Sequence, residues 1–279
     1  MTTTLRPSGP LQQNGTGARS RPYEIRVNSR RVGSLVIAAD TPMGPRVGEL
    51  RELYVDEGDR RRGRATVAAL AAEEVLRGWG CRHVRATVPA ASEAGIRLAR
   101  ALGYPEEGRT MRKALPAEAP ALPAGVRLRR MTDQEYEDWF RGAVEDYAAR
   151  CVERGMTPDA ALAHAREDSR ALLPRGQDTP GSSVAALEVD GTDVGRLWMA
   201  ERELAPGVPG WYVFDVKVLP AHRGRGHGRT LLLQAERTAL AAGAGWIGLH
   251  RFSDNTPAVR LYDSLGYRTA SVNFAKILL

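Results

Sequence analysis

The stretch that decides the fold is VFDVKVLPAHRGRGHGRTLLLQAERTALAAG, residues 213–243. Residues 213–219 predict a β-strand, because β-branched and other apolar side chains dominate them. A loop of glycine and basic residues follows at 223–228, and residues 230–242 then predict a helix. Glycines allow successive backbone N–H groups to converge, and a helix N-terminus adds positive potential. The stretch therefore predicts a site for an anionic group such as a pyrophosphate.

Two familiar phosphate-binding loops do not fit this spacing. In a Walker loop, GxxxxGK[ST], the glycines are farther apart than Gly224 and Gly228, and a lysine stands where this chain has Arg229. The dinucleotide fingerprint GxGxxG fails because Gly226 and Gly228 are followed by Leu231 at the third glycine position. Taken by itself, the loop is equally compatible with a flexible surface turn.

The same unit occurs twice in the chain, at a constant offset of 163 residues. No gap is needed between residues 60 and 113 of the first copy and residues 223 and 276 of the second. The matching positions include the loop, the following helix and a terminal Leu-Gly-Tyr: Arg60 with Arg223, Gly63 with Gly226, Glu73 with Glu236, residues 102–104 with 265–267, and Lys113 with Lys276. A shared loop, helix and terminus at one separation indicates an internal duplication.

The second copy resembles the GNAT superfamily of acyl-CoA N-acyltransferases. Its Arg223-x-x-Gly226-x-Gly228 matches the [Q/R]xxGx[G/A] signature, and the segment from Asn255 to Tyr267 is similar to the second family signature. The resemblance covers residues 125–279 and is weaker in the first copy. It implies an α/β (α+β) fold with two tandem GNAT-type domains. Each would be a mixed, mostly antiparallel sheet with a central splayed parallel strand pair flanked by helices.

The resemblance also implies how acetyl-CoA would bind. Strands 213–219 and 246–252 would splay apart, and the pantetheine arm would bond to the free backbone of the first strand like an added strand. The glycine loop would hold the pyrophosphate. The cofactor-binding residues expected on this basis are Val216, Val218, Arg223, Gly224, Arg225, Gly226, His227, Gly228, Arg229, Asn255 and Tyr262. For Asn255, an ordinary helix N-cap is the alternative interpretation.

Two residues are the catalytic candidates. Tyr262 matches the proton donor that the family provides to the departing thiolate, although it could simply pack on a helix face. Asp215 lies in an otherwise apolar strand, where an unpaired buried carboxylate would be costly. We therefore expect Asp215 to face a cleft or to meet a partner such as Lys217 or an arginine, and to act as general base or as an anchor for the substrate ammonium. A structural ion pair is the alternative for Asp215, and His250 or an ordered water is the alternative base.

The two copies are not expected to share one task. The first copy has Ala99 where the second has Tyr262, and it lacks counterparts of two helices predicted at about 133–153 and 158–172. We expect a disordered tail at 1–21, a degenerate GNAT-like domain at 22–116, a linker at 117–124 and a catalytic GNAT domain at 125–279. The first copy would be structural or regulatory, with or without residual CoA binding.

Composition excludes several other classes of protein. The chain has 279 residues and a net charge of 40 − 33 = +7, with no zinc-finger or RNA-binding signature, so nucleic acid is not an expected partner. No run approaches the ~18 apolar residues of a membrane helix, and no motif indicates a metal site. Two cysteines, Cys81 and Cys151, fit a reducing cytoplasm. The expected activity is acetyl-CoA-dependent N-acetylation of a primary amine on a small molecule, an amino-sugar or a peptide. The alternative is a CoA-binding sensor or scaffold without turnover.

Overall fold

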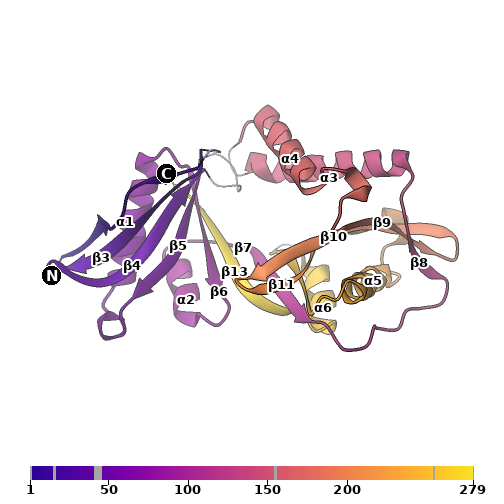
Figure 1. The fold of residues 1–279 in the computed structure, drawn as a ribbon. Helices are drawn as coiled ribbons and strands as arrows, with labels where there is room; N and C mark the ends of the chain where they lie inside the picture. Colours follow the sequence, from indigo (N-terminus) through magenta and orange to yellow (C-terminus); the bar gives the residue numbers. More distant parts are fainter. Residues whose placement is uncertain (1, 15–16, 41–45, 154–155, 254, 279) are drawn as a thin grey trace. The chain divides into compact units, whose positions relative to one another are not determined.

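The computed structural model describes residues 2–14, 17–40, 46–153, 156–253 and 255–278 (Figure 1). The chain forms two compact units. Unit 1 comprises Met1–Gly108, Ala149–Ala161 and Ser271–Leu279, and unit 2 comprises Arg109–Ala148 and Leu162–Ala270. Each unit contains one copy of the repeat, but its last strand comes from the other copy.

Unit 1 is a mixed sheet with helices. Its strand order is β1 (Thr3–Pro7), β3 (Arg19–Val27), β4 (Arg30–Ala39), β5 (Val47–Val55), β6 (His83–Pro89) and β13 (Arg268–Ile277), and β2 (Gln12–Gln13) pairs with β3. Only the β5–β6 pair is parallel among the pairings described in this unit, and it extends from Val47–His83 to Leu50–Ala86. The helices are α1 (Arg64–Gly78) and α2 (Glu93–Ala101), and a short 3-10 turn, η1, spans Glu57–Asp59.

The expected disordered tail at residues 1–21 is wrong for most of its length. Strand β1 pairs antiparallel with β3, from Thr3–Val27 to Pro7–Tyr23, and Leu5 packs against the core of unit 1. The polar composition of this segment suggested disorder, but an edge strand needs only backbone hydrogen bonds and a few apolar contacts to be held in place.

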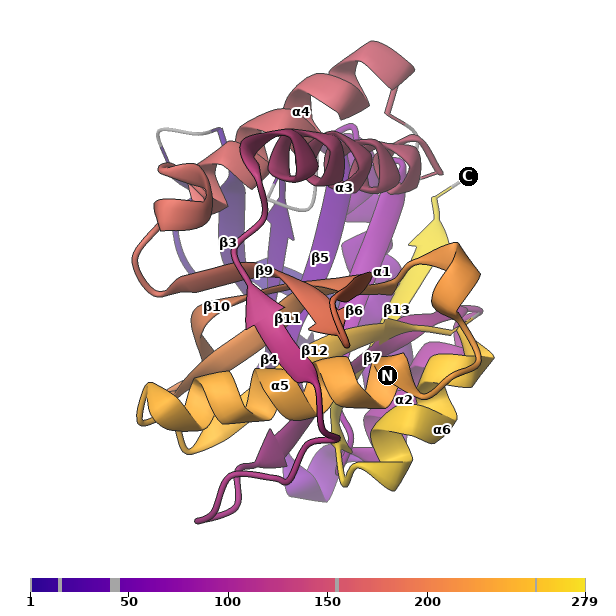
Figure 2. The ribbon, with the colours of Figure 1, turned by 90° about the vertical axis from the view of Figure 1, so that its right-hand side faces the viewer.

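Unit 2 repeats the same plan with an extra helical layer. Its strand order is β7 (Glu106–Ala114), β12 (Trp246–Phe252), β11 (Val208–Val218), β10 (Thr192–Ala205), β9 (Ser182–Val189) and β8 (Val126–Arg129), and β11–β12 is a parallel pair. Helices α3 (Asp133–Glu153) and α5 (His227–Ala241) lie on opposite faces of strands β9–β11 (Figure 2). Helix α6 (Thr256–Ser264) packs with α5, and α4 (Pro158–Leu172) follows α3. The mixed sheet with a central parallel pair confirms the expected fold class.

The last strands are exchanged between the two copies. Lys113 of the first copy places Nζ 2.7 Å from both carboxylate oxygens of Glu236 in unit 2, and that glutamate is fully buried. The equivalent Lys276 of the second copy pairs with Glu73 in unit 1, at 3.0 Å. The compact units therefore differ from the contiguous ranges 22–116 and 125–279, because each range lacks the strand and the lysine that complete its own sheet.

Candidate active site

The parallel pair of unit 2 separates after three register positions. Strands β11 and β12 pair at Trp211–Ile247, Tyr212–Gly248 and Val213–Leu249, although β11 continues to Val218 and β12 to Phe252. A register shift against β10 leaves Phe214 of β11 as an extra residue, and such bulges re-aim side chains next to active sites. The backbone beyond Val213 is thus released on the β12 side. This confirms the expected splay and places Val216 and Val218 along it.

The glycine loop opens α5 with left-handed backbone at two positions. Gly224 has φ +76° and Gly226 has φ +85°, and a Cβ at either would meet nothing within 4 Å. Glycine is therefore required there by conformation rather than by crowding. The N–H groups of Arg229 and Thr230 both donate to the Gly226 carbonyl. Earlier N–H groups of a helix start have no partner in the helix, so they are available to an anion.

The arginines of this loop have different tasks. Arg223 Nε donates to the Val218 carbonyl at 3.4 Å, and Arg229 Nη2 donates to Ser264 Oγ at 2.7 Å. These two side chains brace the loop against β11 and α6, whereas Arg225 is exposed on the turn itself. The His227 ring lies 6.3 Å from the His222 ring, edge to face.

Tyr262 lies buried on α6 beside the start of α5. Its neighbour Leu261 closes against Gly228, where an added Cβ would stand 3.2 Å from Leu261 Cδ2. The Tyr262 side chain is 6% exposed. Burial, and then the negative charge of Asp215, raise the pKa of the Tyr262 hydroxyl. The phenol is therefore protonated at neutral pH and close enough to Asp215 to feel its charge.

Asp215 has an indole partner that the sequence did not reveal. Trp139 Nε1, on α3, donates to Asp215 Oδ2 at 2.8 Å. Lys217, the cation named in the sequence analysis, has its Nζ 3.3 Å from Asp146 Oδ2. The spacing of apolar residues in the α3 sequence indicates that its aromatic side chains share one face of the helix. It does not indicate which of them contacts β11.

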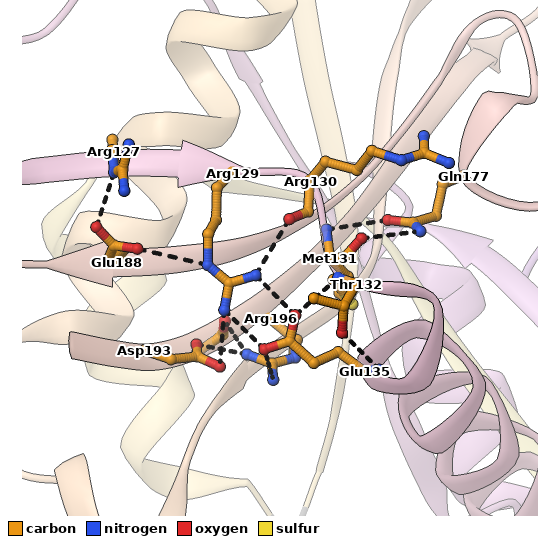
Figure 3. A network of polar contacts seen from close by, with 11 residues as sticks. Arg127, Arg129, Arg130, Met131, Thr132, Glu135, Gln177, Glu188, Asp193 and Arg196 are labelled. Carbon is orange, nitrogen blue, oxygen red and sulfur yellow. Dashed lines mark hydrogen bonds and ion pairs between the residues drawn. The ribbon is translucent and has the colours of Figure 1, made fainter. Parts of the chain in front are cut away.

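A polar network fixes the N-terminal end of α3, and hence Trp139 (Figure 3). Thr132 and Glu135 form a capping box, in which Glu135 N donates to Thr132 Oγ1 and Thr132 N donates to Glu135 Oε2. Arg129, the last residue of β8, donates to both oxygens of Glu135 at 2.7 Å. This guanidinium lowers the pKa of Glu135 to about 2, so the network stays ionised well into acid.

Asn255 is a helix cap. Its Oδ1 accepts from Ala258 N at 3.3 Å, at the start of α6. The equivalent Ser92 caps α2 in the first copy by accepting from Gly95 N. The alternative interpretation of Asn255 is therefore observed, while a contact to a cofactor stays a prediction. His250 lies on β12 beyond the last paired residue, with its ring 4.7 Å from Phe252.

The corresponding loop of unit 1 carries a buried acid. Arg61 and Gly63 adopt the left-handed backbone of Gly224 and Gly226. However, Asp59, which is 5% exposed, pairs with Arg64, the first residue of α1, and with Arg30 at 2.9 Å. At the offset of 163, Asp59 and Arg64 stand where unit 2 has two histidines. An internal carboxylate therefore lies at the helix start that a phosphate would approach.

Other site types find little support in the described part of the chain. None of its helices is long and apolar enough to cross a membrane. Nor do its histidine, cysteine and acidic side chains gather into a group of three or more that could hold a metal ion.

Comparison with known proteins identifies the family. The model of the acetyltransferase (GNAT) family matches residues 7–104 and 136–267. A mycothiol acetyltransferase of Thermobispora bispora is 32% identical over 236 residues, which are 80% of this chain and 73% of the relative. The uncharacterized N-acetyltransferase YycN of Bacillus subtilis is 26% identical over 155 residues, which are 55% of this chain and 99% of the relative.

Two solved structures share the fold over most of the chain. A tandem GNAT protein from the clavulanic acid biosynthesis pathway superposes with a TM-score of 0.53 at 20% identity, covering 96% of this chain and 85% of that one. A GCN5-related N-acetyltransferase from Sphaerobacter thermophilus gives a TM-score of 0.57 at 18% identity, covering 92% and 80%. With the family match on both copies, the chain belongs to the GNAT acetyltransferase family and is an acetyltransferase built from two copies of the family unit.

Proposed function

We propose that unit 2 transfers an acetyl group from acetyl-CoA to a primary amine by direct attack, and that unit 1 carries out no chemistry. The observation that carries this proposal is that Asp215, hydrogen-bonded to Trp139, lies just past the last β11–β12 pair in the same unit as the buried phenol of Tyr262, whose pKa burial and Asp215 raise. A protonated phenol and a carboxylate in one site can provide the acid and the base of an acyl transfer.

The residues of unit 2 fit a CoA ester. The loop from Gly224 to Gly228 offers N–H groups at the start of α5, with open space over its left-handed glycines, for a pyrophosphate. The backbone of Val216 and Val218, past the last β11–β12 pair, offers hydrogen bonds to an amide-bearing arm. When bound, acetyl-CoA supplies an acyl group activated as a thioester.

Asp215 would remove the proton from the attacking amine, directly or through a water. An alkyl ammonium has a pKa of ~10.4, so most of the acceptor arrives charged at neutral pH. The Trp139 hydrogen bond stabilises the ionised carboxylate and holds it in place. Tyr262 would donate its proton toward the departing sulfur, and its raised pKa keeps that proton in place until negative charge develops there.

Unit 1 lacks the pieces that this chemistry needs. Ala99 replaces the tyrosine, and Asp59 places a negative charge against the first residue of α1. A carboxylate there repels a phosphate. We therefore assign to the first copy a supporting part, which includes the strand β7 that completes unit 2.

The test is release of free thiol from acetyl-CoA by the full chain with a panel of amines. Because this chain is similar to a mycothiol acetyltransferase of T. bispora, the panel should include small-molecule amines, among them the amine precursor of mycothiol. Tyr262→Phe should lower kcat by about 10²-fold or more, the usual contribution of a general acid. Tyr54→Phe, at a tyrosine that is 49% exposed in unit 1, should not. CoA binding without thiol release on any amine would favour the sensor or scaffold instead.

A further inference from the structure

Unit 2 contains a cavity of about 160 Å³ at the closed end of the splay. Strand β11 contributes Tyr212 and β12 contributes Gly248, and these two residues pair one position before the last pair of the two strands. The end of β10 contributes Arg202 and Leu204, and β7 contributes Arg112. A cavity of ~150 Å³ accommodates a benzene-sized molecule, so this one suits a fragment of similar size.

The direction of β11 places this cavity opposite the cofactor loop. The strand runs from Tyr212 at the cavity to Val218, directly before the glycine loop. A CoA ester held at the loop and along 216–218 would therefore point its acyl end toward the cavity. The pKa of Tyr212 is raised to about 12, first by burial and also by the nearby Tyr262, so the cavity wall lies within electrostatic reach of the proposed acid.

Two guanidinium groups border the cavity. Arg202 Cζ lies 5.0 Å from the centroid of the Tyr212 ring, and Arg112 Cζ lies 5.2 Å from the centroid of the Trp246 ring. Stacking on an aromatic face leaves the N–H edge of arginine available for a planar anion. Within the described ranges, no carboxylate forms an ion pair with either side chain. Glu203 also lines the cavity, but its Oε1 accepts from Gly207 N at 2.5 Å.

We propose that this cavity is the acceptor subsite, and that Arg112 and Arg202 bind a carboxylate carried by the amine substrate. The acceptor would then be an amino acid or another small amino carboxylate, which deepens the proposed function and rests on it. Arginine is suited to this task because its fork of N–H donors matches the two oxygens of a carboxylate. The carboxylate holds the molecule, and the amine is left to face the acyl group.

This assignment gives the first copy a direct part in recognition. Arg112 belongs to β7, which is the last strand of the first copy of the repeat but lies in unit 2. The first copy would thus select the acceptor for a reaction that it does not perform itself. The first copy would then serve unit 2 in two ways: β7 completes its sheet, and Arg112 on β7 binds the acceptor.

The experiment compares matched amines with the full-length protein at saturating acetyl-CoA. The pairs are an amino acid with its carboxamide, and γ-aminobutyrate with butylamine, and 3-aminopropylphosphonate is the third arm. We expect kcat/KM to be about 10- to 100-fold higher for the carboxylate of each pair, as for the gain of a charged hydrogen bond. Arg202→Gln and Arg112→Gln should remove that preference by raising KM for the carboxylates, with kcat and the KM for acetyl-CoA changed little.

Controls separate recognition from folding. Arg127→Gln removes an exposed arginine of unit 2 that pairs with Glu188, and it should leave the preference intact. Arg202→Lys keeps the positive charge, so it should retain part of the preference for carboxylates that Arg202→Gln loses. Equal turnover of carboxylates and their neutral partners by the wild type would overturn this inference while leaving the proposed function standing, and a preference for the phosphonate would overturn the carboxylate assignment. Failure of every amine would instead count against the proposed function.

Discussion

Replacing Trp139 by phenylalanine should change the pH dependence of the reaction. The substitution keeps an aromatic ring against Trp198 but removes the N–H that donates to Asp215 Oδ2 at 2.8 Å. That bond favours the ionised carboxylate, so its loss lets the carboxyl keep its proton to higher pH. A hydrogen bond to a charged group contributes about 1.5–3 kcal/mol. At 1.36 kcal/mol per pH unit, the acid limb of kcat/KM should move up by about one to two pH units.

The assay is the pH profile of kcat/KM from thiol release, with Trp198→Phe as the matched control. Trp198 is as buried as Trp139, at 8% exposed, but its Nε1 has no hydrogen-bond partner among the described residues. Both variants lose similar volume, and both should unfold more readily, by about 1–3 kcal/mol. Only Trp139→Phe should move the acid limb.

Loss of the Arg129–Glu135 pair, which holds the N-terminal end of α3, would not explain such a shift in the acid limb. Glu135 titrates at about 2 because Arg129 holds it ionised, so the stability that this pair contributes is present above the usual glutamate pKa and is lost only as pH falls toward 2. Equal shifts in both tryptophan variants, or none in either, would refute the positioning of Asp215 by Trp139.

Three further outcomes follow from the structure. Lys113→Met should destabilise the protein by about 3–5 kcal/mol in urea unfolding, because it leaves Glu236 buried and unpaired, whereas Lys217→Met, at an exposed pair, should cost less than about 1 kcal/mol. Isothermal titration should give one CoA site per chain, since Asp59 closes the loop of unit 1, and a second site of similar affinity would contradict that view. Gly226→Ala forces an L-residue to φ +85° at the helix start, so KM for acetyl-CoA should rise about tenfold; an unchanged KM would argue against pyrophosphate binding there.

Local chemistry made much of unit 2 predictable. The capping box at Thr132, the start of α4 at Pro158 and the left-handed glycines of the loop are all encoded within a few residues. The family resemblance added the splay of β11 from β12, which no local pattern contains. The Trp139–Asp215 bond joins residues 76 positions apart, and nothing near either residue in the sequence marks the other.

The exchange of the last strands was beyond prediction for a different reason. The offset of 163 aligns Lys113 with Lys276 and Glu73 with Glu236, so the two copies present interchangeable partners. Pairing within a copy and pairing between copies satisfy the same buried charges and the same apolar pattern. The choice depends on the path of the chain after each terminal Leu-Gly-Tyr, which is a property of the whole fold.

The charges at the two helix starts give a physical reason to expect that the first copy lacks the ligand and still keeps its fold. A helix start beside converging N–H groups is favourable only when something negative lies near it. In unit 2 the proposed partner is a phosphate that comes and goes, and two histidines stand at 222 and 227. In unit 1 the carboxylate of Asp59 lies near this helix start and is paired with the side chains of Arg64 and Arg30. Asp59 therefore brings a carboxylate to the place where a phosphate would approach and ties it to the side chain of the first residue of α1, so we expect this ion pair both to disfavour an anion there and to hold the loop against the helix.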